Sequence, residues 1–383
     1  MAKPFIKIIL FIAVLVFLCE NVSYSQSRDE LMTKGIDYVY KIKFDSAKAV
    51  FRQIIDNDPQ DPTGYFLIAM AEWWKIYLNK NDESNDEIYR SAVDRCLKVC
   101  DERLDKNEND DWALFLKGGI IGYRGFLNGL RDNWLAAVDD GREGLSLLKR
   151  CIELNPSNKD ALLGIGLYNY AVNYVTDRYP FLKTLLFFFP TGNKEEGFAQ
   201  LRDCIEHAKF ARTEATVVMC YVYLSYEKNY YEAEKYADTL YKQYPDNPAA
   251  ERFLANSYTG EGKWAQSLAL WRDILMKIDS SYPGYNKTYL KRETLYYLGL
   301  GYMKMRNLDT ALMYYTEAFD MSPALDKDKE SPMQVFSALG IAMVYDMKGN
   351  HGEAVKYYDR VLNMEDIEDS HEAARKYKEN GYK

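Results

Sequence analysis

The sequence is poor in the residues that most enzymes use for acid–base or metal chemistry. It contains only three histidines, His207, His351 and His371, and none has a companion at the spacing of a metal-ligand set or a catalytic triad. It also lacks a G-x-S-x-G, Walker, H-E-x-x-H or phosphate-cradling glycine motif. We therefore expect a protein that is not an enzyme and that uses no cofactor and no metal ion.

Positive charge is scarce as well. The 49 lysines and arginines are outnumbered by 57 aspartates and glutamates, which gives a formal net charge of −8. No basic stripe is interleaved with aromatic residues, and an acidic surface repels a phosphate backbone. The charge pattern therefore disfavours nucleic-acid binding.

The cysteines form neither a disulfide pattern nor a metal-binding pattern. Five of the six lie beyond residue 25, and an odd number cannot pair completely within one chain. Cys151 and Cys204 fall at small-residue positions on the core face of expected helices, where a free thiol packs as a small apolar group. Cys96 and Cys100 lie one helical turn apart, but no second ligand pair lies nearby. We expect the cysteines to be structural residues.

The only long apolar run lies at the N-terminus. Lys3 and Lys7 precede apolar residues 8–18, and a polar segment follows that ends in Ser-Tyr-Ser at residues 23–25. This is the pattern of a secretory signal peptide, whereas a membrane span needs about 20 apolar residues. We expect residues 1–25 to be a cleaved signal peptide, and the mature protein to be soluble or peripheral.

Two other roles for this segment stay open. The segment could remain uncleaved as an anchor, or a lipid could be attached at Cys19. Bulky Phe17 and Leu18 stand where a bacterial lipid-attachment site has small residues, so the lipoprotein alternative is the weaker one. The sequence predicts an exported bacterial protein that is periplasmic or associated with the outer membrane.

Helical periodicity dominates the rest of the chain. The period-two alternation that marks a half-buried strand is not sustained anywhere. Residues 292–323 instead contain two helical faces, which are joined by a short turn and closed by Pro323. The first face carries Leu295, Leu298, Gly299 and Tyr302, and the second carries Ala311, Tyr315 and Ala318. This alternation of large and small residues resembles the tetratricopeptide repeat (TPR), whose period is about 34 residues.

The same pattern fits most of the chain. Regular repeats are expected at residues 28–61 and 214–366, irregular repeats that bear inserts at residues 62–210, and a cap at residues 368–383. The resemblance implies an all-α fold, a right-handed superhelical solenoid of about eight TPR-like antiparallel helix pairs with a C-terminal capping helix. Residues 28–383 would then form one continuous solenoid, because stacked repeats share their apolar faces.

Three stretches depart from the repeat, at residues 79–87, 125–134 and 175–193. The first is polar enough to be an exposed loop, and the second is expected to lie between two helices. The third contains an apolar insert, in which burial would be worth roughly 1.5–3 kcal/mol for each side chain. Its main members are Phe181, Leu185, Leu186, Phe187, Phe188 and Phe189. The insert either packs back onto the solenoid or contacts a membrane surface, a lipid or a partner.

The middle of the chain also resembles known groups of TPR proteins. The sequence GFLNGLRDNW at residues 125–134, followed by GIGLYNYAVNY and FLKTLLFFFPTGNKEEG, resembles uncharacterised exported bacterial TPR proteins. Residues 163–201 distantly resemble the eukaryotic inclusion-body-clearance family, TPR proteins linked to lipid droplets and aggregate removal. Neither resemblance supplies a catalytic residue.

The sequence therefore predicts binding rather than catalysis. TPR ligands usually lie along the concave face, which the first helix of each repeat forms. On this register the candidate partner-binding residues are Asn169, Tyr170, Asn173, Arg252, Asn256 and Tyr296. We expect a non-enzymatic scaffold that binds a protein or peptide in the bacterial cell envelope. The alternative is a module that binds a lipid, a hydrophobic ligand or a membrane surface through residues 181–189.

Overall fold

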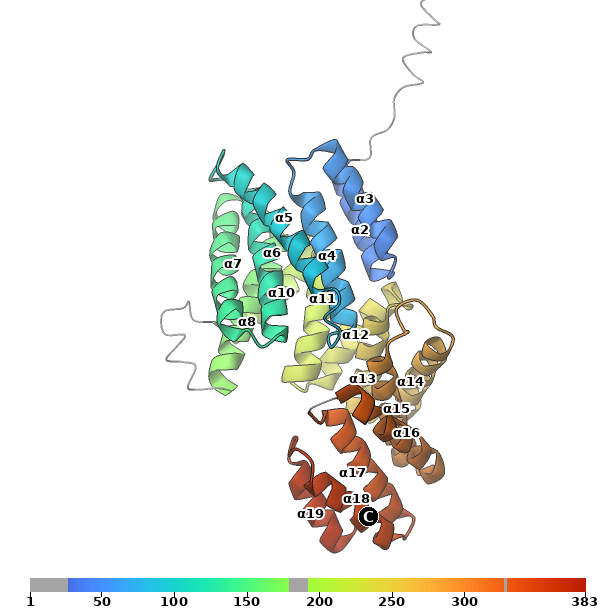
Figure 1. The fold of residues 1–383 in the computed structure, drawn as a ribbon. Helices are drawn as coiled ribbons and strands as arrows, with labels where there is room; N and C mark the ends of the chain where they lie inside the picture. The colour runs from blue at the N-terminus through green and yellow to red at the C-terminus, as the bar shows by residue number, and fades with distance from the viewer. Residues whose placement is uncertain (1–26, 179–191, 327–328) are drawn as a thin grey trace, which may run out of the picture.

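The computed structural model describes residues 27–178, 192–326 and 329–383, and this part of the chain is built from helices without strands (Figure 1). The expected signal peptide at residues 1–25 and the apolar insert at residues 181–189 lie outside the described residues, so both stay predictions. The expected fold class is confirmed. The described helices form a right-handed solenoid of eight TPR-like antiparallel pairs, followed by a terminal capping helix.

The pairs follow one another along the chain. The first four are α2 (Arg28–Tyr40) with α3 (Phe44–Asn57), α4 (Thr63–Leu78) with α5 (Asp86–Leu104), α6 (Asp111–Leu130) with α7 (Trp134–Leu154), and α8 (Leu162–Arg178) with α10 (Lys194–His207). The next four are α11 (Arg212–Tyr221) with α12 (Tyr230–Gln243), α13 (Pro248–Gly260) with α14 (Trp264–Asp279), α15 (Thr288–Lys304) with α16 (Leu308–Asp326), and α17 (Pro332–Met347) with α18 (His351–Leu362). The remaining elements are the short helix η1 (Lys159–Ala161), the π-helical turn η3 (Val222–Tyr226) and the capping helix α19 (Ser370–Asn380).

Glycines at the helix crossings allow close packing within and between the repeats. Tyr315 on α16 is fully buried, and its ring occupies the space next to Gly299 on α15. A Cβ atom at Gly299 would lie 2.7 Å from that ring, and one at Gly340 on α17 would lie 2.6 Å from it. One ring therefore packs against two consecutive repeats. This is the combination of large and small residues that the pattern of residues 292–323 predicts.

Helix α16 does not end at Pro323, where the repeat pattern placed its end. It continues to Asp326, although proline has no N–H for the backbone hydrogen bond to residue i−4. The additional turn brings Asp326 against Arg292 on α15, with Oδ1 and Nη1 2.6 Å apart. Both side chains are nearly enclosed, and this charge-assisted contact attaches the last turn of α16 to α15.

The glycine-rich stretch at residues 125–134 was predicted to lie between two helices, and this is wrong. Helix α6 continues through most of it, and α7 begins at its last residue. A Cβ atom at Gly125 would lie 3.1 Å from Asp140 Cβ on α7, so the glycine is required for close packing. Asp140 is buried at this contact and accepts a hydrogen bond from Asn128 Nδ2 at 2.8 Å. The stretch forms a helix–helix contact rather than an insert.

The solenoid turns far enough for its first repeat to reach its middle. Asn247 Nδ2, immediately before α13, donates to the backbone carbonyl of Tyr40 at the end of α2, over 2.8 Å. The Tyr40 ring packs on Tyr244 with centroids 5.2 Å apart. Lys209, which precedes α11, forms an ion pair with Asp29 on α2. By contrast, α17, α18 and α19 extend away from the first repeats, at the bottom of Figure 1.

Candidate partner-binding surface

The inner side of the first five repeats is filled by the protein's own side chains. Glu214 on α11 accepts hydrogen bonds from Tyr40 Oη at 2.6 Å and from Trp74 Nε1 at 3.1 Å. Tyr123 on α6 provides a third hydrogen bond to the same carboxyl group. Burial raises the pKa of Glu214, although these three hydrogen bonds oppose the rise. This part of the concave face is packed core and not a groove.

A partly open polar site lies where α4, α11, α13 and α15 approach one another. Arg252 on α13 pairs with Glu293 on α15, with Nη2 and Oε2 2.6 Å apart. Lys80, just after α4, places its Nζ 4.8 Å from the centroid of the Tyr77 ring and 4.9 Å from that of the Tyr221 ring. All five side chains keep part of their surface accessible. We call these five residues the inner-face site.

The charges of the inner-face site are not balanced. Burial and then the charge of Arg252 lower the pKa of Lys80 to about 8, and Glu293 opposes this change. A lysine with this pKa is still mostly protonated at neutral pH. The site thus holds two cations and one carboxylate, within a protein whose formal net charge is −8.

Aromatic rings extend the site in two directions. The Tyr221 and Tyr226 rings meet edge-on with centroids 5.4 Å apart, and Tyr226 lies 4.5 Å from the Tyr174 ring on α8. On the other side, Tyr297 on α15 stacks on Trp271 with centroids 4.6 Å apart and an interplanar angle of 11°. These rings are held by their neighbours, so a ligand that contacts them does not have to order them first.

The π-helical turn η3 brings two of these tyrosines to one face. The Glu227 backbone N–H donates to the carbonyl of Val222, five residues earlier, at 3.0 Å. The turn is therefore one residue longer than an α-helical turn. Because of this added residue, Tyr226 points to nearly the same side as Tyr221, five positions before it. Such turns occur frequently at functional sites.

Two of the six predicted partner-binding residues, Asn169 and Tyr170, are buried. Asn169 Nδ2 donates to Gln200 Oε1 at 2.8 Å, and Tyr170 Oη donates to Glu227 Oε1 at 2.7 Å. Their side chains join α8 to α10 and to the end of η3. Since they are enclosed, we correct both from surface residues to packing residues.

The other four predicted residues keep part of their surface accessible. Arg252 belongs to the inner-face site, and Asn256 follows it by one helical turn, with Nδ2 donating to the Arg252 carbonyl at 3.0 Å. The Tyr296 ring meets the Tyr297 ring with centroids 5.0 Å apart, and burial raises the pKa of Tyr296 to about 12. Asn173 lies on α8, two repeats earlier than Arg252. Partner binding by these four residues stays a prediction.

Four members of the inner-face site, Tyr77, Lys80, Tyr221 and Glu293, were not predicted from the sequence. Lys80 lies in the polar stretch at residues 79–87, which was interpreted as a solvated loop. In the structure, Arg131 Nη1 donates to the backbone carbonyl of Lys80 at 2.7 Å and thereby fixes the loop. The abundance of tyrosine, 33 residues in all, was the one available signal of an aromatic inner face.

We also searched the described residues for a metal site, a reactive thiol and a membrane-spanning helix. They contain no group of three or more His, Cys, Asp or Glu side chains that could hold a metal ion. The cysteines beyond residue 25 are buried, and burial raises the pKa of Cys151 to about 11 and of Cys204 to about 12. Both therefore lie in the core, as predicted, and remain protonated at neutral pH. None of the described helices combines the length and the apolar character that crossing a bilayer requires.

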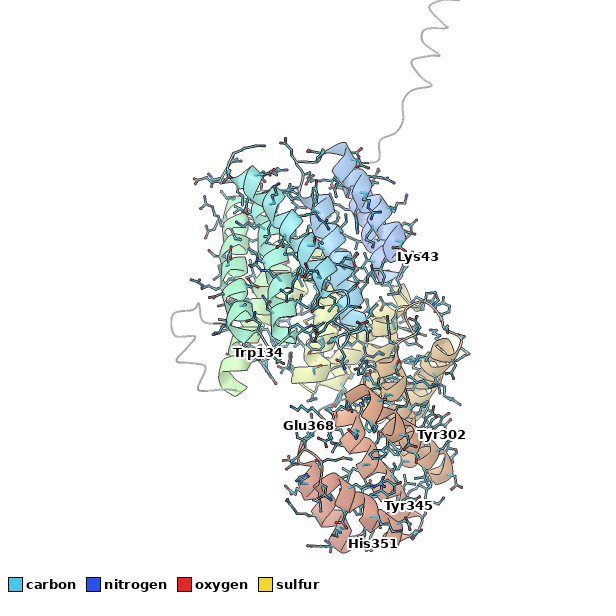
Figure 2. All side chains as sticks on the ribbon, viewed as in Figure 1. Lys43, Trp134, Tyr302, Tyr345, His351 and Glu368 are labelled. Atoms are coloured by element: carbon cyan, nitrogen blue, oxygen red, sulfur yellow. The ribbon has the colours of Figure 1, made fainter. Side chains whose placement is uncertain are left out.

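An apolar patch is exposed where α6 meets α7. Trp134 is 64% exposed and Leu135 is 77% exposed, and Phe126 and Val138 contribute further apolar surface. Figure 2 shows Trp134 at the start of α7, on the outside of the helical array. We call these four residues the α6–α7 patch. Large apolar side chains that cluster on a surface often mark an interaction site.

Comparisons with known proteins agree with the fold. Residues 291–364, which span most of α15 to α18, match the tetratricopeptide repeat family. No curated protein sequence matches the chain. Among solved structures, the fold is similar to that of a chain in the crystal structure of the APC/C hetero-tetramer Cut9-Hcn1, with a TM-score of 0.55 and 14% sequence identity. The match covers 94% of this chain and only 57% of that one. The comparisons therefore support a TPR protein. The sequence match supports it at residues 291–364, and the similarity of the fold supports it over most of the chain.

Proposed function

We propose that this protein is a non-enzymatic scaffold that binds a protein or peptide partner along the inner-face site and the adjoining rings of Tyr226 and Tyr297. The observation that carries the proposal is a partly accessible cluster of tyrosine, arginine and lysine side chains at the junction of four first helices. Tyrosine and arginine are enriched at the energetic centres of protein interfaces. The hydrogen-bonded core of Tyr40, Trp74 and Glu214 leaves no groove for a ligand at that part of the inner side.

The form of the site favours an extended segment of a partner. The accessible side chains come from several different repeats rather than from a single repeat. Stacked repeats typically present such extended concave surfaces. The hydroxyl groups of the tyrosines and the guanidinium group of Arg252 can donate hydrogen bonds to peptide carbonyls.

We place this activity in a bacterial cell envelope. The support is the signal-peptide pattern at residues 1–25 and the resemblance of residues 125–134 and their surroundings to exported bacterial TPR proteins. The similar solved structure is a hetero-tetramer of Cut9 with Hcn1. We carry over only the general role, a TPR solenoid that assembles with another protein.

Site-specific photocrosslinking tests the proposal. The photoreactive amino acid p-benzoyl-L-phenylalanine would replace Asn256 on the inner face or, as a matched control, Met276 on α14, which is 60% exposed. In the native host, irradiation should give one adduct of defined mass from position 256 and none of that mass from position 276. Adducts of the same mass and yield from both positions, or none from position 256, would reject the inner face as the binding surface.

A second candidate function, contact with a membrane surface, is favoured by the α6–α7 patch. Exposed tryptophan and leucine side chains partition into the interfacial region of a bilayer. Flotation with phosphatidylcholine and phosphatidylglycerol liposomes tests this alternative. A Trp134→Ser/Leu135→Ser variant should lose flotation, whereas Met313→Ser, a control on α16 that is 53% exposed in the wild type, should keep it. If the wild-type protein itself does not float, membrane contact is excluded as its function.

A further inference from the structure

The outer face of α16 exposes apolar side chains to solvent. Helix α16 is the second helix of the seventh pair, so this face lies on the convex side of the solenoid, away from the inner-face site. Leu312, Met313 and Met321 line a shallow depression of about 640 Å³ along it, and Met313 is 53% exposed. Methionine is a flexible apolar side chain that is common at surfaces which bind other proteins.

The same face is acidic. Asp309, Glu317 and Asp320 line the depression together with the apolar residues, at the spacing of one helical face. Helix α16 contains no lysine, arginine or histidine, whereas every other described second helix contains at least one lysine or arginine. The helix therefore combines an exposed apolar stripe with charge of one sign.

One of these three carboxylates has no cationic partner. Lys348, just after α17, forms an ion pair with Asp309. Lys291 on α15 places its Nζ 3.8 Å from Oε1 of Glu317, which is a long ion pair. Asp320 is exposed, and in the part of the chain that the structure describes its carboxylate has neither an ion pair nor a hydrogen bond. Asp320 is therefore the carboxylate that a partner's cation can reach.

The positions of these side chains define the partner that fits. Met313 and Asp320 are seven positions apart, which corresponds to about 10 Å along an α-helix. A helix that packs along α16 would thus place a basic residue about two turns from the apolar residue that contacts Met313. Because α16 offers no sheet edge to which a strand could be added, recognition has to use side chains, as in the binding of amphipathic helices.

We propose that the outer face of α16 docks an amphipathic helix of a partner protein, with an apolar residue on Met313 and a lysine or arginine paired with Asp320. This surface is separate from the inner-face site, so the inference goes beyond the proposed function and does not depend on it. Nucleic acid, an anionic membrane and an acidic helix are excluded, because their negative charges would meet the carboxylates of this face.

The experiment selects peptides that require this face. A phage-displayed library of 18-residue peptides with high helix propensity would first be depleted on the purified full-length Met313→Ser/Asp320→Lys variant. The remaining phage would then be selected on the wild-type protein. One selected peptide would be synthesised, together with a form in which glutamine replaces its basic residues. Fluorescence anisotropy would give the Kd of both forms, and circular dichroism would confirm that each protein variant is folded.

The proposal predicts a specific pattern of affinities. Met313→Ser should weaken binding about tenfold, because an apolar contact is lost. Asp320→Asn should weaken binding up to about fivefold, the range of an exposed ion pair, and Asp320→Lys should weaken it further. The glutamine form should bind Asp320→Asn and the wild type equally. An increase in NaCl from 50 to 500 mM should weaken binding of the basic form but not of the glutamine form.

A matched control lies on another outer helix. Ile88 on α5 is also 53% exposed and has the exposed Glu87 beside it. Glu87→Lys/Ile88→Ser should leave the Kd unchanged, since it makes the same kinds of change away from α16. Asn256→Arg, which obstructs the inner face, should also leave it unchanged.

The other outcomes overturn the proposal. It is wrong if no peptide survives depletion, if the selected peptides lack a basic residue, or if Asp320→Lys leaves the Kd unchanged. Loss of binding in Asn256→Arg would assign the peptide to the inner face, which would overturn this inference and leave the proposed function standing. Sedimentation of the protein alone provides a further check. A wild-type dimer that Met313→Ser dissociates would show that a second copy covers the face, in place of a partner helix.

Discussion

Replacement of Glu251 by glutamine should stabilise the middle of the solenoid relative to the wild type at pH 7.5. At pH 5 this gain in stability should be much smaller. Glu251 on α13 is fully buried and accepts hydrogen bonds from Tyr285 Oη at 2.6 Å and from Lys277 Nζ at 2.9 Å. Tyr285 lies in the linker between α14 and α15, so the carboxyl group of Glu251 fixes that linker. Burial raises the pKa of Glu251 from 4.5 to about 7, while the two donors and the charge of Lys277 oppose the rise.

The sign and the size of the effect follow from linkage. A carboxyl group whose pKa is higher in the folded than in the unfolded state holds its proton more tightly when folded. The stabilisation is complete below pH 4.5 and is lost as the pH rises toward 7. With the folded pKa near 7, the wild type should lose about 2 kcal/mol between pH 5 and pH 7.5 through this group. Asp273, whose pKa is lowered, and Lys277, whose pKa is raised, titrate outside this range. Glutamine remains neutral and should lose nothing.

Hydrogen exchange measured by mass spectrometry tests this reasoning, because the stability of a solenoid is local. The opening free energy of α13 and of the linker at residues 280–287 would be measured at pH 5 and pH 7.5 after correction for the intrinsic exchange rates. The difference between Glu251→Gln and the wild type should change by about 2 kcal/mol between the two pH values. Glu153→Gln, a change at an exposed position on α7, should show no such difference. An equal pH dependence in Glu251→Gln and the wild type would refute the argument.

Three further predictions concern the packing of the solenoid. Gly340→Ala should lower stability in thermal denaturation by about 1–3 kcal/mol, because the new methyl group would lie 2.6 Å from the Tyr315 ring. Gly122→Ala, the control, has no neighbour within 4 Å and should raise stability by about 1 kcal/mol. Equal effects of the two substitutions would contradict the packing. Glu214→Ala should lower the free energy of unfolding by about 3 kcal/mol or more, because three buried donors lose their acceptor. The same substitution should speed amide exchange in α2. Unchanged protection of α2 would argue against the contact between the first and fifth repeats. Iodoacetamide should alkylate Cys204 only in denaturant, and rapid alkylation of the native protein would show that this thiol is accessible.

The sequence predicted what depends on neighbouring residues. The spacing of Gly299, Ala311 and Tyr315 indicated how two consecutive helices pack, because both helices and their short turn lie within one period. Pro323 was misinterpreted as the end of the helix because the partner that keeps the next turn helical, Arg292, lies on the preceding helix. The glycines at residues 125–134 were taken for a connection, although close packing against α7 explains them.

The candidate site was beyond this reasoning because its residues meet only through the turn of the whole solenoid. Lys80 and Arg252 are four pairs apart, and no local pattern fixes the angle between successive repeats. The burial of Tyr170 likewise depends on Glu227 at the end of η3, a π-helical turn that periodicity does not reveal. The six partner-binding residues were predicted only from their positions on the first helix of each repeat. They therefore included both accessible and buried side chains.

The contact of the first repeat with the middle of the chain also sets the order of folding. Tyr40 Oη reaches Glu214, 174 positions later, and the Tyr40 carbonyl reaches Asn247, 207 positions later. A chain that emerges from the ribosome with its N-terminus first cannot complete the packing of α2 until the segment before the sixth pair has been synthesised. Such contacts between distant residues slow folding, because a long loop must close before they form. Folding of the first repeat should thus be completed only after the middle of the chain has been synthesised, which leaves its apolar face accessible to chaperones while synthesis and any export proceed.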